Sequence, residues 1–183
     1  MEKINKLVRD RVSGVLASKG YNVVTKKLND EQRKNGLYSL FLREFKECEE
    51  TGNASKRITH CADMLQILDT LFEGESLHEH TRNKQDHPLK WYEKLASERE
   101  RVKKSKTNLL SKFYELLTIE NNEVFQDQLK EVSNAVKDWI ESINLDFDRV
   151  VQVCKDRLAK LGGFNQGVYL EGVEASSRVE EGL

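Results

Sequence analysis

Apolar residues recur at intervals of three and four along most of the chain, the spacing that places them on one face of an α-helix. This periodicity predicts helices at about residues 3–19, 30–50, 55–73, 91–118, 121–143 and 146–161. Residues 21–28 favour β structure but are few, which predicts an extended connector or a single short strand. Residues 74–90 are polar and predict a loop, and residues 174–183 predict a frayed tail. We therefore expect an all-α helical bundle with at most one short strand near residues 22–28.

Residues with known preferences for helix ends support these boundaries. Gly20 and the pair Gly162 and Gly163 each follow a helical stretch, where glycine commonly ends the helix. Asn29 and Asp30 precede the second predicted helix and are suitable N-caps. The helices are therefore expected to be separate elements joined by short connections.

Composition and charge narrow the classes of partner. Charged residues make up 33% and apolar residues 38% of the chain, and the net charge is −1. This balance suits amphipathic helices and gives no reason to expect a nucleic-acid partner. No stretch of apolar residues is long enough to cross a membrane, and the first residues lack the apolar core of a signal peptide. Three cysteines without a CxxC pair favour a reducing compartment, so we expect a cytoplasmic protein.

Two acidic residues on the second predicted helix are candidates for metal chemistry. With about 100° of rotation per residue, Glu44 falls in the middle of the apolar stripe and Glu47 lies about 60° away. A carboxylate on a core-facing stripe is costly unless a cation or a hydrogen-bond donor receives it. Carboxylates spaced i,i+3 project toward one point, and such oxygen clusters suit Mg²⁺ or Mn²⁺. On the spacing alone, an internal salt bridge to a lysine or arginine from another helix is the more common arrangement, because ExxE pairs are frequent in helices.

The third predicted helix carries His60 and Asp63, also spaced i,i+3. Asp63 lies toward the edge of the apolar face, so its position fits a solvated helix residue as well as a ligand. His60 fits a partly buried polar residue equally well. The periodicity alone leaves both alternatives open.

Three separated blocks resemble one branch of the MazG-like nucleoside triphosphate pyrophosphohydrolases, which include phosphoribosyl-ATP pyrophosphohydrolase. They are NKLVRDRV at 5–12, LREFKE at 42–47 with HCADMLQIL at 60–68, and RLAKLGGFNQGVYLE at 157–171. The blocks occur in the order found in that family of small all-α enzymes. The resemblance implies a core formed by residues 1–73 and 146–173. Residues 74–145 lie outside it and are expected to be an inserted loop with helices.

The resemblance implies metal-dependent hydrolysis of a nucleoside triphosphate between the α and β phosphates, giving a nucleoside monophosphate and pyrophosphate. It implies that Glu44, Glu47 and Asp63 are catalytic carboxylates that hold Mg²⁺ or Mn²⁺, with His60 as a further ligand. It also implies a homodimer or a higher homo-oligomer, in which the inserted helices could replace part of a partner's bundle.

Substrate contacts are expected from four further residues. Lys6 and Arg9 in the first block, and Lys160 near the last, are candidates to bind phosphates. Phe164 follows the glycine pair and either packs on the base or anchors the tail to the bundle. We favour anchoring.

Two positions depart from the pattern of the family. Arg43 stands where the family has the first glutamate of EExxE, and His60 stands where it has the glutamate of ExxD. A neutral imidazole is a softer ligand than a carboxylate, which predicts a weak enzyme that prefers Mn²⁺. The same departures favour an alternative function, a non-catalytic nucleotide sensor or helical interaction protein. Glu47 and Glu50 form another i,i+3 pair, but we prefer the register of Glu44 and Glu47 because it keeps Glu44 on the inner face of the helix.

Other candidate sites have less support. His78, His80 and His87 could bind zinc, but no further ligand completes a persuasive set, and a solvated loop is the simpler interpretation. The run ERERVKKSK at 98–106 could contact RNA, yet its mixed charge indicates an exposed helix face. The cysteines have no histidine at a recognisable spacing, which argues against covalent catalysis.

Overall fold

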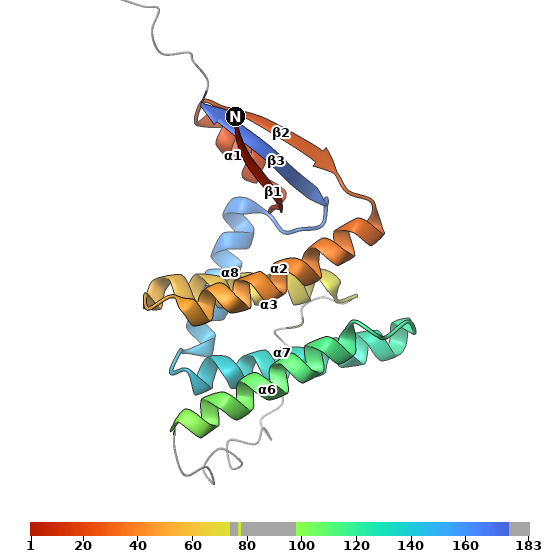
Figure 1. Cartoon of the computed structure of the whole chain (residues 1–183), viewed down its shortest axis with the longest axis vertical. Helices are drawn as coiled ribbons and strands as arrows, with labels where there is room; N and C mark the ends of the chain where they lie inside the picture. The colour runs from red at the N-terminus through yellow and green to blue at the C-terminus, as the bar shows by residue number, and fades with distance from the viewer. Residues whose placement is uncertain (74–76, 78–97, 176–183) are drawn as a thin grey trace, which may run out of the picture.

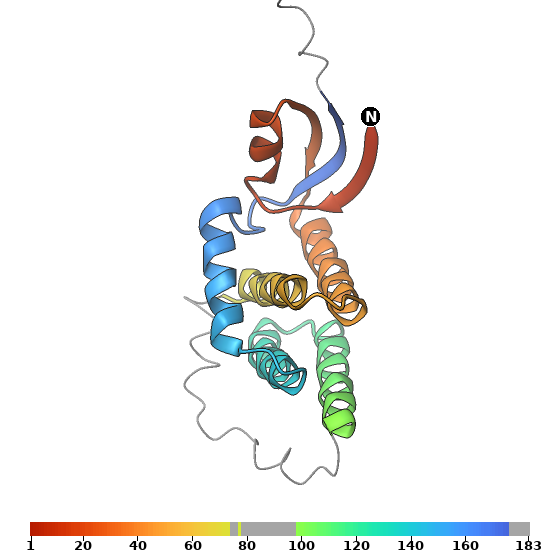
Figure 2. The same ribbon diagram turned by 90° about the vertical axis from the view of Figure 1, so that its left-hand side faces the viewer.

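The computed structural model describes residues 1–73, 77 and 98–175. The described elements, in chain order, are β1 (Glu2–Leu7), α1 (Val12–Ser18), β2 (Tyr21–Lys27), α2 (Asp30–Glu50), α3 (Ala54–Leu71), α6 (Glu98–Leu116), α7 (Asn122–Ser142), α8 (Phe147–Leu161) and β3 (Val168–Ala175). The sheet and α1 form one end of the molecule, the α2–α3 pair forms the middle, and the α6–α7 pair forms the other end (Figure 1). Helix α8 runs along the side and connects the level of α7 with the sheet (Figure 2).

The all-α prediction is wrong, because the described residues form a mixed α/β fold. Three strands make an antiparallel sheet in the order β1-β3-β2, beside six helices. The predicted strand at 22–28 exists as β2, but it is one of three. Strand β3 lies in the centre of the sheet and pairs with both β1 and β2.

The first predicted helix, at residues 3–19, is divided into a strand and a short helix. Asn5 has a positive φ of 49°, which no residue of a continuous right-handed helix adopts. The β1–β3 register shifts between Lys3 and Lys6, as expected of a β-bulge. The segment Glu2–Leu7 is too short for its apolar residues to distinguish a helix from a strand, and pairing with β3 selects the strand.

Strand β3 was not predicted from the sequence. Its pairing partners are far away in the sequence: Val168 is opposite Lys27, and Tyr169 is opposite Leu7. Gly172 permits a close approach between β3 and β1, since a Cβ atom built there would lie 2.8 Å from the carbonyl oxygen of Glu2. Strand β3 thus includes Glu174 and Ala175, the first two residues of the predicted tail, and residues 176–183 lie outside the described part of the chain.

Several predicted helix ends are confirmed. Asn29 caps α2 through a capping box with Gln32. Gly20 follows α1 with a φ of +83°, and Gly162 follows α8 with a φ of +75°. Both angles lie in the region that favours glycine, which explains why the helices end there.

Aromatic side chains join the two helical pairs into one core. The rings of Phe41 on α2 and Phe113 on α6 are stacked with centroids 4.1 Å apart, and the rings of Phe45 on α2 and Trp139 on α7 have centroids 4.7 Å apart. All four side chains are buried. Helix α2 is thus packed against α6 and α7 through Phe41 and Phe45, and the site described below lies where α2 faces α3.

Two sequence-based alternatives concern the inserted segment. The run at 98–106 begins α6, where Lys106 pairs with Glu49 at 2.6 Å. His78, His80 and His87 lie outside the described residues. Among the helices that the structure describes, none has both the length and the apolar character needed to cross a membrane.

Candidate functional site

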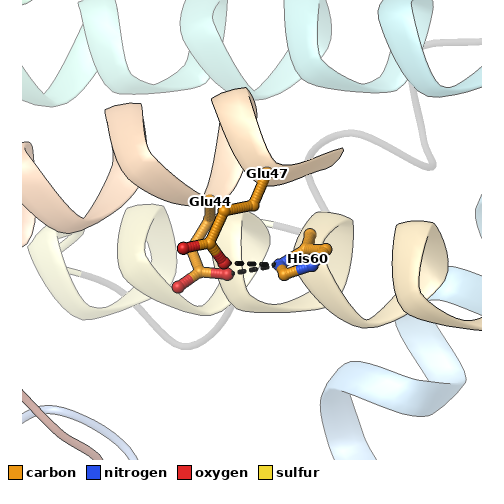
Figure 3. Close-up of side chains that lie close together, drawn as sticks. All are labelled: Glu44, Glu47 and His60. Atoms are coloured by element: carbon orange, nitrogen blue, oxygen red, sulfur yellow. Dashed lines mark hydrogen bonds and ion pairs between the residues drawn. The ribbon is translucent and has the colours of Figure 1, made fainter. Parts of the chain in front are cut away.

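Glu44, Glu47 and His60 form a compact cluster between α2 and α3 (Figure 3). The Nδ1 atom of His60 lies 2.7 Å from Oε2 of Glu44 and 3.5 Å from Oε2 of Glu47. The side chain of Glu44 is 10% exposed, that of His60 18% and that of Glu47 46%. The cluster is therefore anchored in the core at Glu44 and opens to solvent at Glu47.

Local sequence explains how this cluster forms. The i,i+3 spacing puts Glu44 and Glu47 on one face of α2. The helix ends at Glu50, and Asn53 caps α3 by accepting a hydrogen bond from the backbone N–H of Lys56 at 3.0 Å. This short connection folds α3 back along α2 and places His60 opposite the two glutamates.

Arg43 binds the same two carboxylates from another direction. Its Nη2 lies 3.3 Å from Oε1 of Glu44, and its Nε lies 3.7 Å from Oε1 of Glu47. Each carboxylate therefore has one oxygen near Arg43 and the other near His60. Two negative charges share one permanent positive charge here, which reduces the electrostatic cost of holding them together.

The donor atoms of this cluster suit a divalent ion. One ligand atom from each of Glu44, Glu47 and His60 can be chosen so that all lie within 4.8 Å of one another. Two carboxylate oxygens and one imidazole nitrogen form a mixed ligand set. Such a set suits Mn²⁺ better than Mg²⁺, because Mg²⁺ prefers ligands that are all oxygen atoms. The residues present thus fit a bound divalent cation.

Asp63, which the family resemblance placed with the metal ligands, lies in a separate group with two arginines. Its Oδ1 accepts from Nη2 of Arg9 at 2.6 Å and from Nε of Arg157 at 2.9 Å, and its Oδ2 accepts from Nη2 of Arg157 at 2.8 Å. Its side chain is 13% exposed. The structure therefore brings Glu44, Glu47 and His60 together and gives Asp63 other partners.

Arg9 is the most buried charged residue of this second group, with 3% exposure. Its Nη1 donates to the carbonyl oxygen of Gly162 at 2.9 Å, and its guanidinium lies 5.0 Å from the ring centroid of Phe164. Its buried Nε has no hydrogen-bond partner among the described residues. Phe164 is itself buried, and its contact with Arg9 holds the start of the tail against the body of the protein.

A pocket of about 360 Å³ lies between the sheet side of the molecule and helices α2, α3 and α8. Its charged lining residues are Lys6, Arg9, Arg43, Glu44, Asp63 and Arg157. The remaining described lining side chains are apolar and come largely from β1, α1 and β3. Glu44 belongs to both the cluster and the pocket, so a ligand in the pocket would reach the edge of the cluster.

Not all of the predicted substrate-binding residues line the pocket. Lys6 and Arg9 line the pocket, as does Phe164, whereas Lys160 is exposed at the end of α8 and is not among the lining residues. Arg157, three residues before Lys160, lines the pocket instead. The sequence signal for Arg157 was its place on the inner side of α8, one turn before the glycine pair. Lys160, which was predicted instead, lies on the outer side of α8.

Two thiols lie directly behind the cluster. The sulfur atoms of Cys48 and Cys61 are 3.6 Å apart and both residues are buried. A hydrogen bond from Cys61 lowers the pKa of Cys48, and the same bond together with burial raises the pKa of Cys61 well above its usual value. Burial also raises the pKa of Cys154 to about 12. These thiols fill the core, and none of them is among the residues that line the pocket.

Comparisons of the chain with known protein families, with curated proteins and with solved structures found no significant match.

Proposed function

We propose that this protein hydrolyses a nucleoside triphosphate to a nucleoside monophosphate and pyrophosphate with the help of a divalent cation. One observation carries the proposal: Glu44 is shared between a cluster that suits a divalent ion and a pocket lined by cations. The three sequence blocks that resemble MazG-like pyrophosphohydrolases support the same activity and suggest attack between the α and β phosphates.

The charges of the pocket suit a polyanionic ligand. Four cations, from Lys6, Arg9, Arg43 and Arg157, face two carboxylates, so the lining carries an excess of positive charge. Arginine is well adapted to phosphate because its planar group donates two parallel hydrogen bonds. The apolar wall supplied by the sheet and α1 offers a surface for the base of a nucleotide.

In the proposed reaction the oxygen of a water molecule forms a bond to the α phosphorus. The bond from that phosphorus to the α–β bridging oxygen breaks, pyrophosphate leaves with the electron pair, and the proton lost by the attacking water passes to solvent. Glu44, Glu47 and His60 would hold the divalent ion, which when bound neutralises the triphosphate and lowers the pKa of the attacking water. Arg157 and Lys6 would bind the phosphates, while Asp63 would fix Arg9 and Arg157 in position.

The experiment is an assay of pyrophosphate release from a panel of ribo- and deoxyribonucleoside triphosphates, with Mg²⁺ and with Mn²⁺. The decisive variant is Glu47→Gln, which removes a ligand charge from the cluster. Its matched control is Glu50→Gln, because Glu50 has the alternative i,i+3 register but is 65% exposed and pairs with Lys46 at 3.7 Å. We expect Glu47→Gln to abolish release and Glu50→Gln to retain it. Full activity of Glu47→Gln would overturn the assignment.

A second candidate function is favoured by a specific observation. Arg43 already pairs with both carboxylates of the cluster, and Asp63 is fully engaged with two arginines. A site neutralised in this way would suit a nucleotide sensor that binds without hydrolysis. Wild-type protein that binds a triphosphate but releases no pyrophosphate with either ion would favour the sensor over the enzyme.

We also propose that the activity belongs to the cytoplasm. Cys48, Cys61 and Cys154 are all buried thiols that form no disulfide among the described residues, which fits a reducing compartment. The homo-oligomer suggested by the family resemblance stays a prediction, which light scattering of the purified chain would test.

A further inference from the structure

We propose that Arg43 exchanges partners during ligand binding. Its guanidinium pairs with Glu44 and Glu47 before a divalent ion binds, and then turns to the phosphates of the nucleotide. The inference rests on the proposed function, since it assigns a role to a residue of the same site. It concerns the position at which this chain departs from the glutamate of the proteins that it resembles.

The two carboxylates present different oxygens to different partners. Oε1 of both glutamates faces Arg43, at 3.3 Å from Nη2 for Glu44 and 3.7 Å from Nε for Glu47. Oε2 of both glutamates faces Nδ1 of His60, at 2.7 Å and 3.5 Å. An ion bound by His60 and the two carboxylates would therefore share its ligands with the guanidinium of Arg43.

Arg43 and a divalent ion compete for the same negative charge. The guanidinium group carries a positive charge, so it opposes the approach of a second cation to the same carboxylates. The Arg43 side chain is 38% exposed and water screens it in part, which limits the effect to a modest factor. We therefore expect Arg43 to weaken binding of a divalent ion in the absence of nucleotide.

The same side chain can assist nucleotide binding. Arg43 lines the pocket together with Lys6, Arg9 and Arg157. Once an ion neutralises Glu44 and Glu47, those carboxylates attract the guanidinium less, and phosphate oxygens become its better partners. Arg43 should therefore act in opposite directions on the two ligands, disfavouring the ion alone and favouring the nucleotide.

The test uses the full-length chain and the variant Arg43→Gln. Binding of Mn²⁺ alone is followed by electron paramagnetic resonance of the free ion. Binding of α,β-methylene-ATP at saturating Mn²⁺ is followed by isothermal titration calorimetry. We expect Arg43→Gln to bind Mn²⁺ about three- to tenfold more tightly and the nucleotide analogue about tenfold more weakly, each tenfold change corresponding to about 1.4 kcal/mol.

Two control variants separate this role from a general effect of charge. Arg43→Lys keeps the positive charge but loses the planar pair of donors, so it should bind Mn²⁺ as the wild type does and the analogue less tightly. Lys46→Gln removes a positive charge from the same helix at a side chain that is 73% exposed and paired with Glu50. It should leave both affinities unchanged.

The outcomes distinguish this inference from the proposed function. If Arg43→Gln binds Mn²⁺ no more tightly than the wild type, or if both ligands change in the same direction, partner exchange is refuted while the metal-dependent enzyme stands. If Lys46→Gln reproduces the effects of Arg43→Gln, the effect is one of overall charge and the inference is also refuted. If neither the wild type nor Arg43→Gln binds Mn²⁺ or the analogue, the proposed function itself fails.

Discussion

Replacing Asp63 by asparagine tests whether this residue is a structural anchor or a metal ligand. The substitution keeps the shape of the side chain and removes its charge. Three hydrogen bonds from Arg9 and Arg157, of 2.6 to 2.9 Å, end on this carboxylate. The exposed fractions of the side chains are 13% for Asp63, 3% for Arg9 and 29% for Arg157, so the group lies mostly away from water.

The loss of stability expected for Asp63→Asn lies between the values for breaking a fully buried ion pair and an exposed one. Removing one partner of a fully buried ion pair costs about 3–5 kcal/mol, and an exposed pair contributes about 0–1 kcal/mol. The asparagine keeps one acceptor oxygen but no negative charge, so the buried charge of Arg9 would lose its counterion, whereas Arg157 can regain water. The amide nitrogen of the new asparagine would also face either Nη2 of Arg157 or Arg9. Both groups are donors, so neither can accept its hydrogen bond. We expect Asp63→Asn to lower the free energy of unfolding by about 2–4 kcal/mol.

The assay is urea unfolding followed by far-UV circular dichroism, with a chelator present so that no metal contributes. With a urea dependence of about 2 kcal/mol per molar, the midpoint should fall by about 1–2 M. The matched control is Glu49→Gln, which breaks the 2.6 Å pair with Lys106 at side chains that are 32% and 39% exposed. Its cost should stay below about 1 kcal/mol, because water replaces the lost partner.

One result would refute this reasoning. If Asp63→Asn stays within about 0.5 kcal/mol of the wild type in chelator and yet weakens Mn²⁺ binding, then Asp63 is a metal ligand, as the family resemblance implies. The arginine pairing would then not describe the working state of the site. A loss of stability as large for Glu49→Gln as for Asp63→Asn would equally show that burial does not set the cost.

Three further predictions concern other parts of the molecule. His60→Glu should raise Mg²⁺-supported pyrophosphate release by at least about tenfold, since it adds a hard oxygen ligand beside Glu44, and an unchanged initial rate would make His60 a bystander. Gly172→Ala should lower the free energy of unfolding by about 1–3 kcal/mol, because its Cβ would meet the carbonyl oxygen of Glu2 at 2.8 Å; an unchanged melting temperature would contradict the close approach of β1 and β3. Cys154, whose pKa burial raises to about 12, should react with a thiol reagent at neutral pH far more slowly in the native protein than in urea, and rapid native labelling would contradict its burial.

The candidate site could be predicted from the sequence where local rules apply. Rotation about one helix axis placed Glu44 on the apolar face, and it is 7% exposed in the structure. The same rule put Glu47 beside it, and the capping residue Asn29 marked the start of α2. These features depend only on residues within a turn or two of helix, which is why periodicity and caps were sufficient. The pairing of His60 with Glu44 needed the family resemblance as well as the spacing.

The sheet and the partners of Asp63 were decided by the tertiary structure alone. Strand β1 lies beside β3 from the other end of the chain, and residues 3–19 by themselves fitted a helix better than a strand. Arg9 and Arg157 reach Asp63 across 54 and 94 residues of sequence. A strand gains its hydrogen bonds, and a buried carboxylate its cations, from whatever segment the fold brings alongside. Local spacing carries no information about that segment, so only the folded chain determines which acidic residues remain free to bind a metal.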